Sequence, residues 1–157
     1  MIALLHHLCR LLARDDLTVE DVVRAVGSVV RDPGVPMPMI LQPSVPGVRA
    51  ASLGRYPETG LPYLLVLEFE RSAEPTVAEL AAAFGRYQRT YSDRGMPIPL
   101  LFEPVADASA WTVALIADLP SGTGALDAAK AERVALRRDP VTAPSGRSRT
   151  DAVRHAS

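Results

Sequence analysis

Two histidines and the only cysteine of the chain lie together in the stretch His6-His7-Leu8-Cys9. Imidazole nitrogens and thiolates are ligands of zinc, and a thiolate beside a base is also a nucleophile. At about 100° per helical residue, however, only His6 and Cys9 are neighbours, and the third histidine, His155, lies near the other end of the chain. We therefore expect no metal site and no nucleophile here, and interpret Cys9 as a core residue on the flank of a helix.

Two further stretches contain residue types that could do chemistry. Glu68 and Glu70 share one face of an expected strand, but no histidine or metal-ligand set accompanies this carboxylate pair. The stretch PSGTGALD at 120–127 lacks both the Gly-Lys-Ser/Thr of a phosphate-binding loop and the third glycine of a dinucleotide-binding motif. We assign no catalytic, cofactor-binding or metal-ligating residue, and we expect no cofactor.

Methionine side chains repack readily, which suits a surface that contacts a partner protein. Met37, Met39 and Met96 are therefore the candidate partner-binding residues. A competing interpretation follows from strand alternation, which would place Met37 and Met39 together on a buried face. The sequence leaves both interpretations open.

Apolar residues recur at helical spacing in three segments. They predict helices over 2–14, from Thr18 as far as Val30, and from Thr76 to Tyr87. The second and third helices begin with a threonine that is followed three residues later by an acid, Asp21 or Glu79, which is the pattern of a capping box. Extended structure is expected between and after these helices, and 62–71 has the alternation of a strand.

Part of this pattern occurs twice in the sequence. TVEDVVRAVG at 18–27 matches TVAELAAAFG at 76–85, and GVPMPMILQP at 34–43 matches GMPIPLLFEP at 95–104. The simplest account is an internal duplication of a unit that contains a capped helix and a proline-spaced strand.

The prolines in the two strand segments predict a place at the edge of the sheet. Prolines at positions two apart lack N–H donors along the same side of a strand, which a central strand does not tolerate. The alternate residues are expected to face the core: Met37, Met39, Leu41, Ile98, Leu100 and Phe102.

Length and composition limit the number of domains, the partners and the cellular location that we expect. A chain of 157 residues fits one domain, which we place at 1–120. We expect a linker with a weak alanine-rich helix at 121–138 and a disordered, arginine-containing tail at 139–157, so truncation after Ala125 should be tolerated. The net charge of −1 gives no reason to expect nucleic acid, a lone cysteine favours a reducing compartment such as the cytoplasm, and no segment is apolar enough to span a membrane.

These elements predict an α+β domain with an antiparallel sheet and helices on one face, in the order helix, helix, three strands, helix, two strands. The stretches AAAFGRYQRTYSDRGMPIPLLFEP and AWTVALIADLP, within 78–120, resemble the second half of the YbjN-like proteins, which have the fold of type III secretion chaperones. This resemblance implies a non-enzymatic protein that binds another protein, with a homodimer as one form of such binding. Sixteen arginines against one lysine, abundant alanine and no asparagine are typical of a GC-rich bacterial genome.

Two functions follow from the sequence. The first is a protein-binding adaptor or chaperone-like module in the bacterial cytoplasm, which agrees with the 48% hydrophobic content and the lack of a catalytic motif. The alternative is a small enzyme or ligand-binding protein whose site is assembled by folding, with Arg55, Glu68, Glu70 and Glu103 as its candidate residues.

Overall fold

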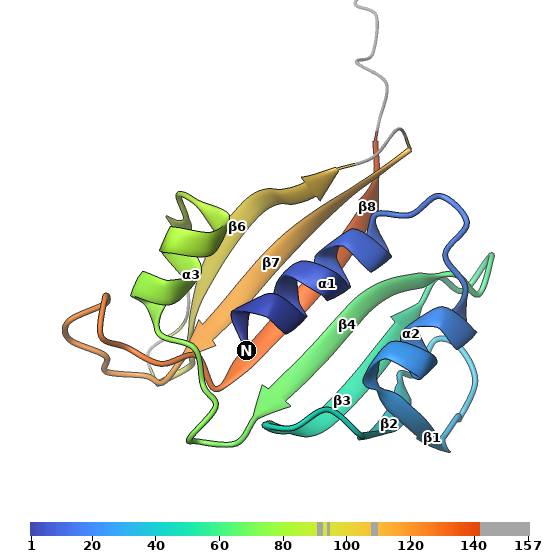
Figure 1. Ribbon diagram of the computed structural model, residues 1–157, viewed down its shortest axis with the longest axis horizontal. Helices are drawn as coiled ribbons and strands as arrows, with labels where there is room; N and C mark the ends of the chain where they lie inside the picture. Colours follow the sequence, from blue (N-terminus) through green and yellow to red (C-terminus); the bar gives the residue numbers. More distant parts are fainter. Residues whose placement is uncertain (91–92, 94, 108–109, 142–157) are drawn as a thin grey trace, which may run out of the picture.

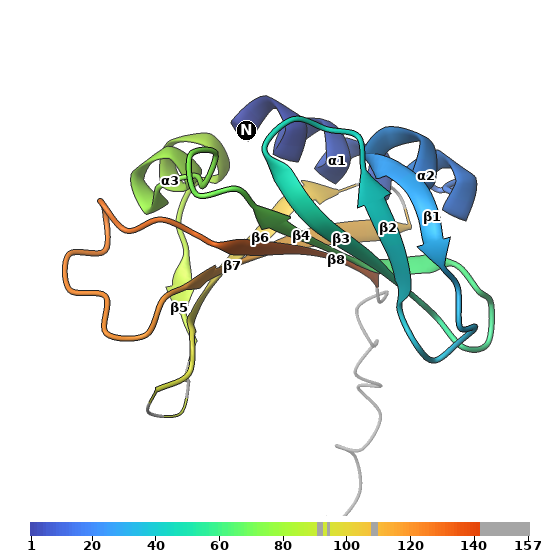
Figure 2. The same ribbon diagram turned by 90° about the horizontal axis from the view of Figure 1, so that it is seen from below.

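The computed structural model describes residues 1–90, 93, 95–107 and 110–141. These residues form three helices on one side of one antiparallel sheet of eight strands (Figures 1 and 2). The helices are α1 (Ile2–Leu12), α2 (Val19–Val26) and α3 (Val77–Phe84). The prediction of an α+β fold with an antiparallel sheet is therefore confirmed.

The eight strands fall into two groups of four. Those before α3 are β1 (Gly27–Arg31), β2 (Met39–Pro43), β3 (Val48–Arg55) and β4 (Pro62–Phe69). Those after α3 are β5 (Gln88–Arg89), β6 (Ile98–Asp107), β7 (Trp111–Leu119) and β8 (Arg133–Pro140). Their order across the sheet is β1-β2-β3-β4-β8-β7-β6-β5, so the two groups meet at β4 and β8. The order differs from the expected one, because β1, β5 and β8 were not foreseen.

Capping boxes begin α2 and α3, as the sequence predicts. The Thr18 hydroxyl accepts a hydrogen bond from the Asp21 N–H, and the Thr76 hydroxyl accepts one from the Glu79 N–H, both at 3.2 Å. In return each carboxylate accepts from the backbone N–H of its threonine. The helix dipole and these bonds favour the ionised carboxylates, and the hydrogen bonds to Thr76 hold the pKa of Glu79 below its usual range.

The expected extension of α2 to Val30 is wrong, because Gly27 ends the helix and begins β1. A Cβ atom at Gly27 would lie 1.9 Å from the carbonyl oxygen of Gln42 on β2. Only glycine permits the backbone of β1 to approach β2 this closely. Val30 consequently lies on a strand and is exposed.

The weak helix expected within 121–138 is also wrong. Residues 133–140 form β8, which lies between β4 and β7 in the middle of the sheet. Val134 and Leu136 alternate into the core, where burial of apolar surface outweighs the helix propensity of an alanine-rich segment. The sheet therefore continues past residue 120, and a truncation after Ala125 would remove β8. Of the expected tail, Asp139 and Pro140 belong to β8, and 142–157 lie outside the described residues.

The prolines of the repeated phrases do not lie on edge strands. Pro36, Pro38 and Pro97 precede β2 or β6, and each of these strands has a neighbour on both sides, β1 and β3 for β2, and β5 and β7 for β6. Strands begin only after Pro36, Pro38 and Pro97, so the missing N–H groups of these three remove little from the ladders. Pro99 lies within β6, and its carbonyl oxygen accepts from Thr90 N–H, so its missing N–H faces the side where β5 pairs with only two residues of β6. Of the six expected core residues, Met39, Leu41, Ile98, Leu100 and Phe102 are buried, whereas Met37 is exposed.

Candidate protein-binding face

One face of the sheet, called here the open face, carries none of the helices in the described part of the chain. Figure 2 shows all three helices above the sheet and none below it. On β4, Leu65 and Leu67 are buried under the helices, so the alternate residues Leu64 and Val66 point to the open face. Both of these apolar side chains are only half-buried.

Cross-strand register extends this apolar surface across the sheet. Val66 pairs with Ala135, Ala135 with Ile116, and Ile116 with Leu101, so an apolar row crosses β4, β8, β7 and β6. Ser52 and Ile40 continue the row onto β3 and β2. With strands about 4.8 Å apart, six strands give a row about 24 Å long that is apolar except for Ser52 on β3.

Ion pairs border the apolar row at both ends of the strands. On one side Arg49 contacts Glu68 at 3.2 Å and Arg133 contacts Asp118 at 2.6 Å. On the other side Arg137 lies 2.7 Å from Asp139 and 3.7 Å from Glu103. Because these charges already pair with one another, a protein that binds the row does not need charged groups to balance them.

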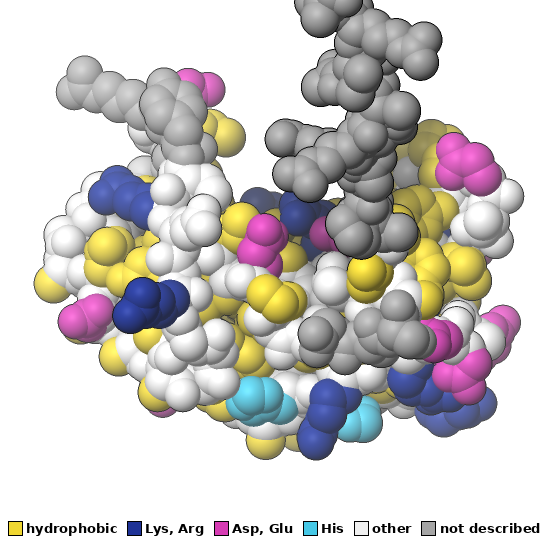
Figure 3. Space-filling model, turned by 90° about the horizontal axis from the view of Figure 1, so that it is seen from above, with side chains coloured by type: hydrophobic (Ala, Val, Ile, Leu, Met, Phe, Trp, Pro, Cys, Tyr) yellow, Lys and Arg dark blue, Asp and Glu magenta, His cyan; other side chains and the backbone are white. Residues whose placement is uncertain are grey.

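Two projecting segments flank the open face. The segments that lead into β2 and β6, which carry the repeated proline phrases, extend to the open side (Figure 2). Met37 and Met96 lie on these segments and are 58% and 57% exposed. In Figure 3 the open side is at the top of the view, and acidic and basic side chains lie there beside hydrophobic ones. Met39 is only 4% exposed and belongs to the core, so it is not accessible to a partner.

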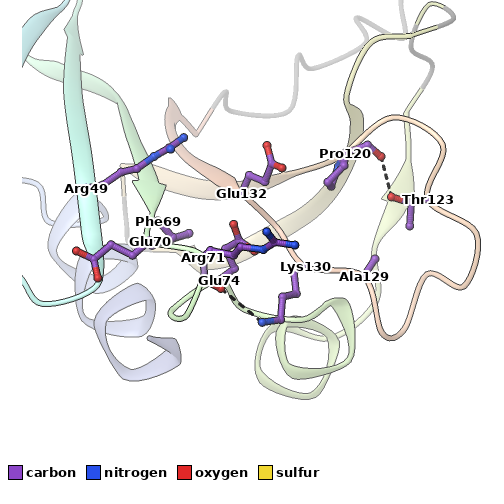
Figure 4. A pocket seen from close by; sticks show the side chains of 10 residues that line it. All are labelled: Arg49, Phe69, Glu70, Arg71, Glu74, Pro120, Thr123, Ala129, Lys130 and Glu132. Atoms are coloured by element: carbon purple, nitrogen blue, oxygen red, sulfur yellow. Dashed lines mark hydrogen bonds between the residues drawn. The ribbon is translucent and has the colours of Figure 1, made fainter.

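A separate hollow of about 650 Å³ lies at one end of the central strands (Figure 4). It is formed by the segment after β4 and by the connection from β7 to β8, in which the Thr123 hydroxyl donates to Pro120 O at 2.7 Å and Lys130 Nζ to Arg71 O at 3.5 Å. The charged side chains that line the hollow include both signs: Arg49, Arg71, Lys130, Glu70, Glu74 and Glu132. The PSGTGALD stretch thus helps to wall this hollow and leads to β8.

The residues considered for chemistry in the sequence are placed apart. His6 is half-buried, with its ring centroid 4.4 Å from that of Phe84 on α3, while His7 is exposed. Both histidines appear in cyan on the helix side in Figure 3. Cys9 is a free, buried thiol, and burial raises its pKa from 9.0 to about 12. This thiol is therefore not poised as a nucleophile.

The candidate residues of the alternative function are also separated. Arg55 donates two hydrogen bonds to Asp32, which lowers the pKa of that carboxyl group. Glu68 pairs with Arg49 and Glu103 with Arg137, on opposite sides of the apolar row. Glu70 lies beyond the end of β4, in the hollow of Figure 4. The fold thus does not gather these four residues into one site.

Arg138, which no sequence pattern singled out, is 0% exposed. Its guanidinium carbon lies 3.6 Å from the centroid of the Trp111 ring, and Nη2 donates to Arg14 O at 2.8 Å. Alternation within an assumed strand would have placed Arg138 beside Val134 and Leu136, but only if the segment had been predicted as a strand.

The described residues contain no cluster of three or more side chains suited to hold a metal ion, and no described helix is long and apolar enough to cross a membrane. The fold and this face define an α+β protein with an open antiparallel sheet face. Comparison with protein-family models, with curated proteins and with solved structures finds no match for the chain.

Proposed function

We propose that this protein is a non-enzymatic protein-binding module, an adaptor or chaperone-like protein, that holds a partner on the open face of its sheet. The single observation that carries the proposal is the apolar row from Ile40 to Leu101, which lies on the side without a described helix. Contiguous exposed apolar surface rimmed by polar groups is typical of protein interaction sites.

The shape and composition of the face favour a narrow partner segment. Ala135 is small and only half-buried, so a partner backbone can approach β8 closely. Met37 and Met96, on the flanking segments, can repack around such a segment from both sides. Their exposure supports the prediction that both methionines contact a partner protein.

The resemblance of 78–120 to YbjN-like proteins agrees with a chaperone-like role, and the lone buried Cys9 agrees with a reducing compartment such as the cytoplasm. The internal duplication also remains part of this proposal. It is supported by the two capping boxes and by the strand order, which places a helix followed by four strands on each side of the β4–β8 junction.

The proposal is tested by affinity capture from the native lysate with matched variants. The wild type should retain a stoichiometric protein partner, and Ile116→Lys, which places a charge in the apolar row, should lose it. Ala3→Lys adds the same charge at an exposed position on α1 and should retain the partner. Equal capture by both variants, with both folded by circular dichroism, would refute binding at the open face.

A small-ligand-binding protein is the second candidate, favoured by the mixed charges around the hollow of Figure 4. A zwitterionic ligand could meet Arg71 and Lys130 with its acid and Glu70 or Glu74 with its amine. Thermal stabilisation by amino acids or short peptides that disappears in Arg71→Ala, but persists in Ile116→Lys, would favour this function over the first.

A further inference from the structure

The two lateral edges of the sheet differ in their capacity to accept another strand. On one side β5 has only two residues, which pair with Leu100 and Leu101, and β6 continues beyond it with Pro104, which has no N–H to donate. On the other side β1 has five residues and no proline. Val29 and Val30 on β1 are 46% and 61% exposed. An edge strand with exposed β-branched residues is a template for strand addition.

Backbone hydrogen bonding identifies which groups of β1 are free to pair. Ser44 N–H donates to Val26 O at 2.9 Å, so the alternation of an antiparallel ladder directs the backbone groups of Ser28 to β2 and those of Val29 away from it. Gly27 N–H is already used, because it donates to Val23 O at the end of α2. Val29 therefore offers both a donor and an acceptor at the centre of the edge.

We infer that β1 is the self-association site of this protein, at which the β1 strand of a second copy pairs antiparallel about a two-fold axis at Val29. On that axis, each Val29 N–H donates to the Val29 carbonyl oxygen of the other copy, which satisfies all four groups. The two valine side chains then form an apolar cross-strand pair. The sheets of the two copies become one continuous sheet.

Charge supports a second copy as the occupant. In this register Arg31 lies opposite Gly27 of the other copy, which has no side chain to oppose it. The two arginines lie about 13 Å apart along the strands. This separation exceeds the Debye length of about 8 Å at physiological ionic strength, so salt screens their repulsion. α2, which directly precedes β1, exposes Glu20 and Arg24 one turn apart, so an antiparallel pair of α2 helices can match opposite charges.

The size of the contact sets the expected strength. One five-residue strand pair with adjoining helix ends buries less than the roughly 800 Å² per partner of a standard stable interface. Association should therefore be reversible and dependent on concentration. It uses other residues than the open face, so it is independent of the proposed function.

Sedimentation velocity of the full chain, from about 10 µM to about 1 mM, tests the inference. The wild type should shift from monomer to dimer, and Val29→Lys should weaken the dimer about tenfold or more, because it sets two cations against each other on the axis. Val35→Lys is the matched control, since Val35 is also an exposed valine but lies outside β1, and it should associate like the wild type.

Thiol crosslinking gives a second readout that does not depend on affinity. Val29→Cys should be crosslinked into a dimer by a short bifunctional maleimide, because Cα atoms of a hydrogen-bonded antiparallel pair lie about 5.5 Å apart. Val35→Cys should not. Three results would each overturn the inference that a second copy pairs with β1. The wild type could stay monomeric at every concentration, or the two lysine variants could have equal effects. The third is a monomer that instead binds an added valine-rich peptide at β1.

Discussion

The fold buries two side chains with reactive or charged groups, the thiol of Cys9 and the guanidinium of Arg138. The Arg138 guanidinium stacks on Trp111 and donates to the carbonyl oxygens of Arg14 and Pro62, so it joins the end of α1 to the sheet. Desolvation lowers the pKa of this group, and the ring and carbonyl contacts offset part of that cost. Arg137, the preceding residue, points to the open face and pairs with carboxylates there. Adjacent residues of one strand thus have separate roles.

Cys9 should be unreactive in the folded protein. Burial raises its pKa from 9.0 to about 12, so at neutral pH almost none of it is thiolate, and a thiol reagent should label it only on unfolding. As pH rises from about 9 toward about 12, the unfolded chain loses this proton while the folded chain retains it, so the free energy of unfolding should fall. Cys9→Ala should reduce that alkaline loss.

Urea denaturation of both proteins at about pH 8 and about pH 10 measures this difference. The wild type should lose more stability between the two pH values than Cys9→Ala does. Rapid labelling of the native wild type, or identical alkaline losses in the two proteins, would contradict the buried, protonated thiol.

At the scale of elements, successive residues of each strand point alternately to the core and to the open face. Leu100 and Leu101 on β6 show the separation, because Leu100 is fully buried under the helices and Leu101 is half-buried in the apolar row. Tyr87, just before β5, packs on the same buried side, with its ring 5.3 Å from that of Phe102. Loss of a side chain on one side therefore removes core packing, and on the other side it alters mainly the surface.

Leu100→Ala should lower the free energy of unfolding by roughly 2–5 kcal/mol, the usual range for a buried leucine, because it leaves a cavity under the helices. Leu101→Ala is the matched control and should cost clearly less, since the open face can rehydrate. Chemical denaturation of both variants measures the difference. Equal losses would show that the open face is packed as tightly as the core.

At the scale of the whole molecule, β8 joins the two halves of the chain. It pairs with β4 from the first half over Arg133–Arg137 and with β7 from the second half over Arg133–Pro140. The connection from β7 to β8 also contacts α3, because Val77 N–H donates to Ala129 O at 2.9 Å and Ala131 N–H to Pro75 O at 2.9 Å. The sheet is continuous only when this strand is present.

Truncation should therefore have opposite outcomes on the two sides of β8. A chain that ends at Ala125 loses the central strand and leaves β4 and β7 without a common partner, so it should not fold cooperatively. A chain that ends at Val141 retains every described strand and should keep a cooperative urea transition. Far-UV circular dichroism during urea titration distinguishes these outcomes, and a cooperative transition of the shorter chain would show that β8 is not required.

The sequence by itself determined the features that depend on neighbours along the chain. The capping boxes at Thr18 and Thr76, the apolar face of α1 and the alternation in 62–71 were predicted correctly, because helix caps and periodicities involve residues a few positions apart. The same helical geometry places His7 and Cys9 on different flanks of the helix, and His7 is exposed whereas Cys9 is buried.

Only the tertiary structure decided what depends on distant partners. An alanine-rich segment became the central strand β8 because β4 and β7 both lacked a neighbour there, and that pairing is invisible in local propensity. The same placement buried Arg138 and turned Arg133 and Arg137 outward. Met37 and Met39 share a sequence pattern but not an environment, because β2 begins at Met39 and alternation into the core starts with the strand.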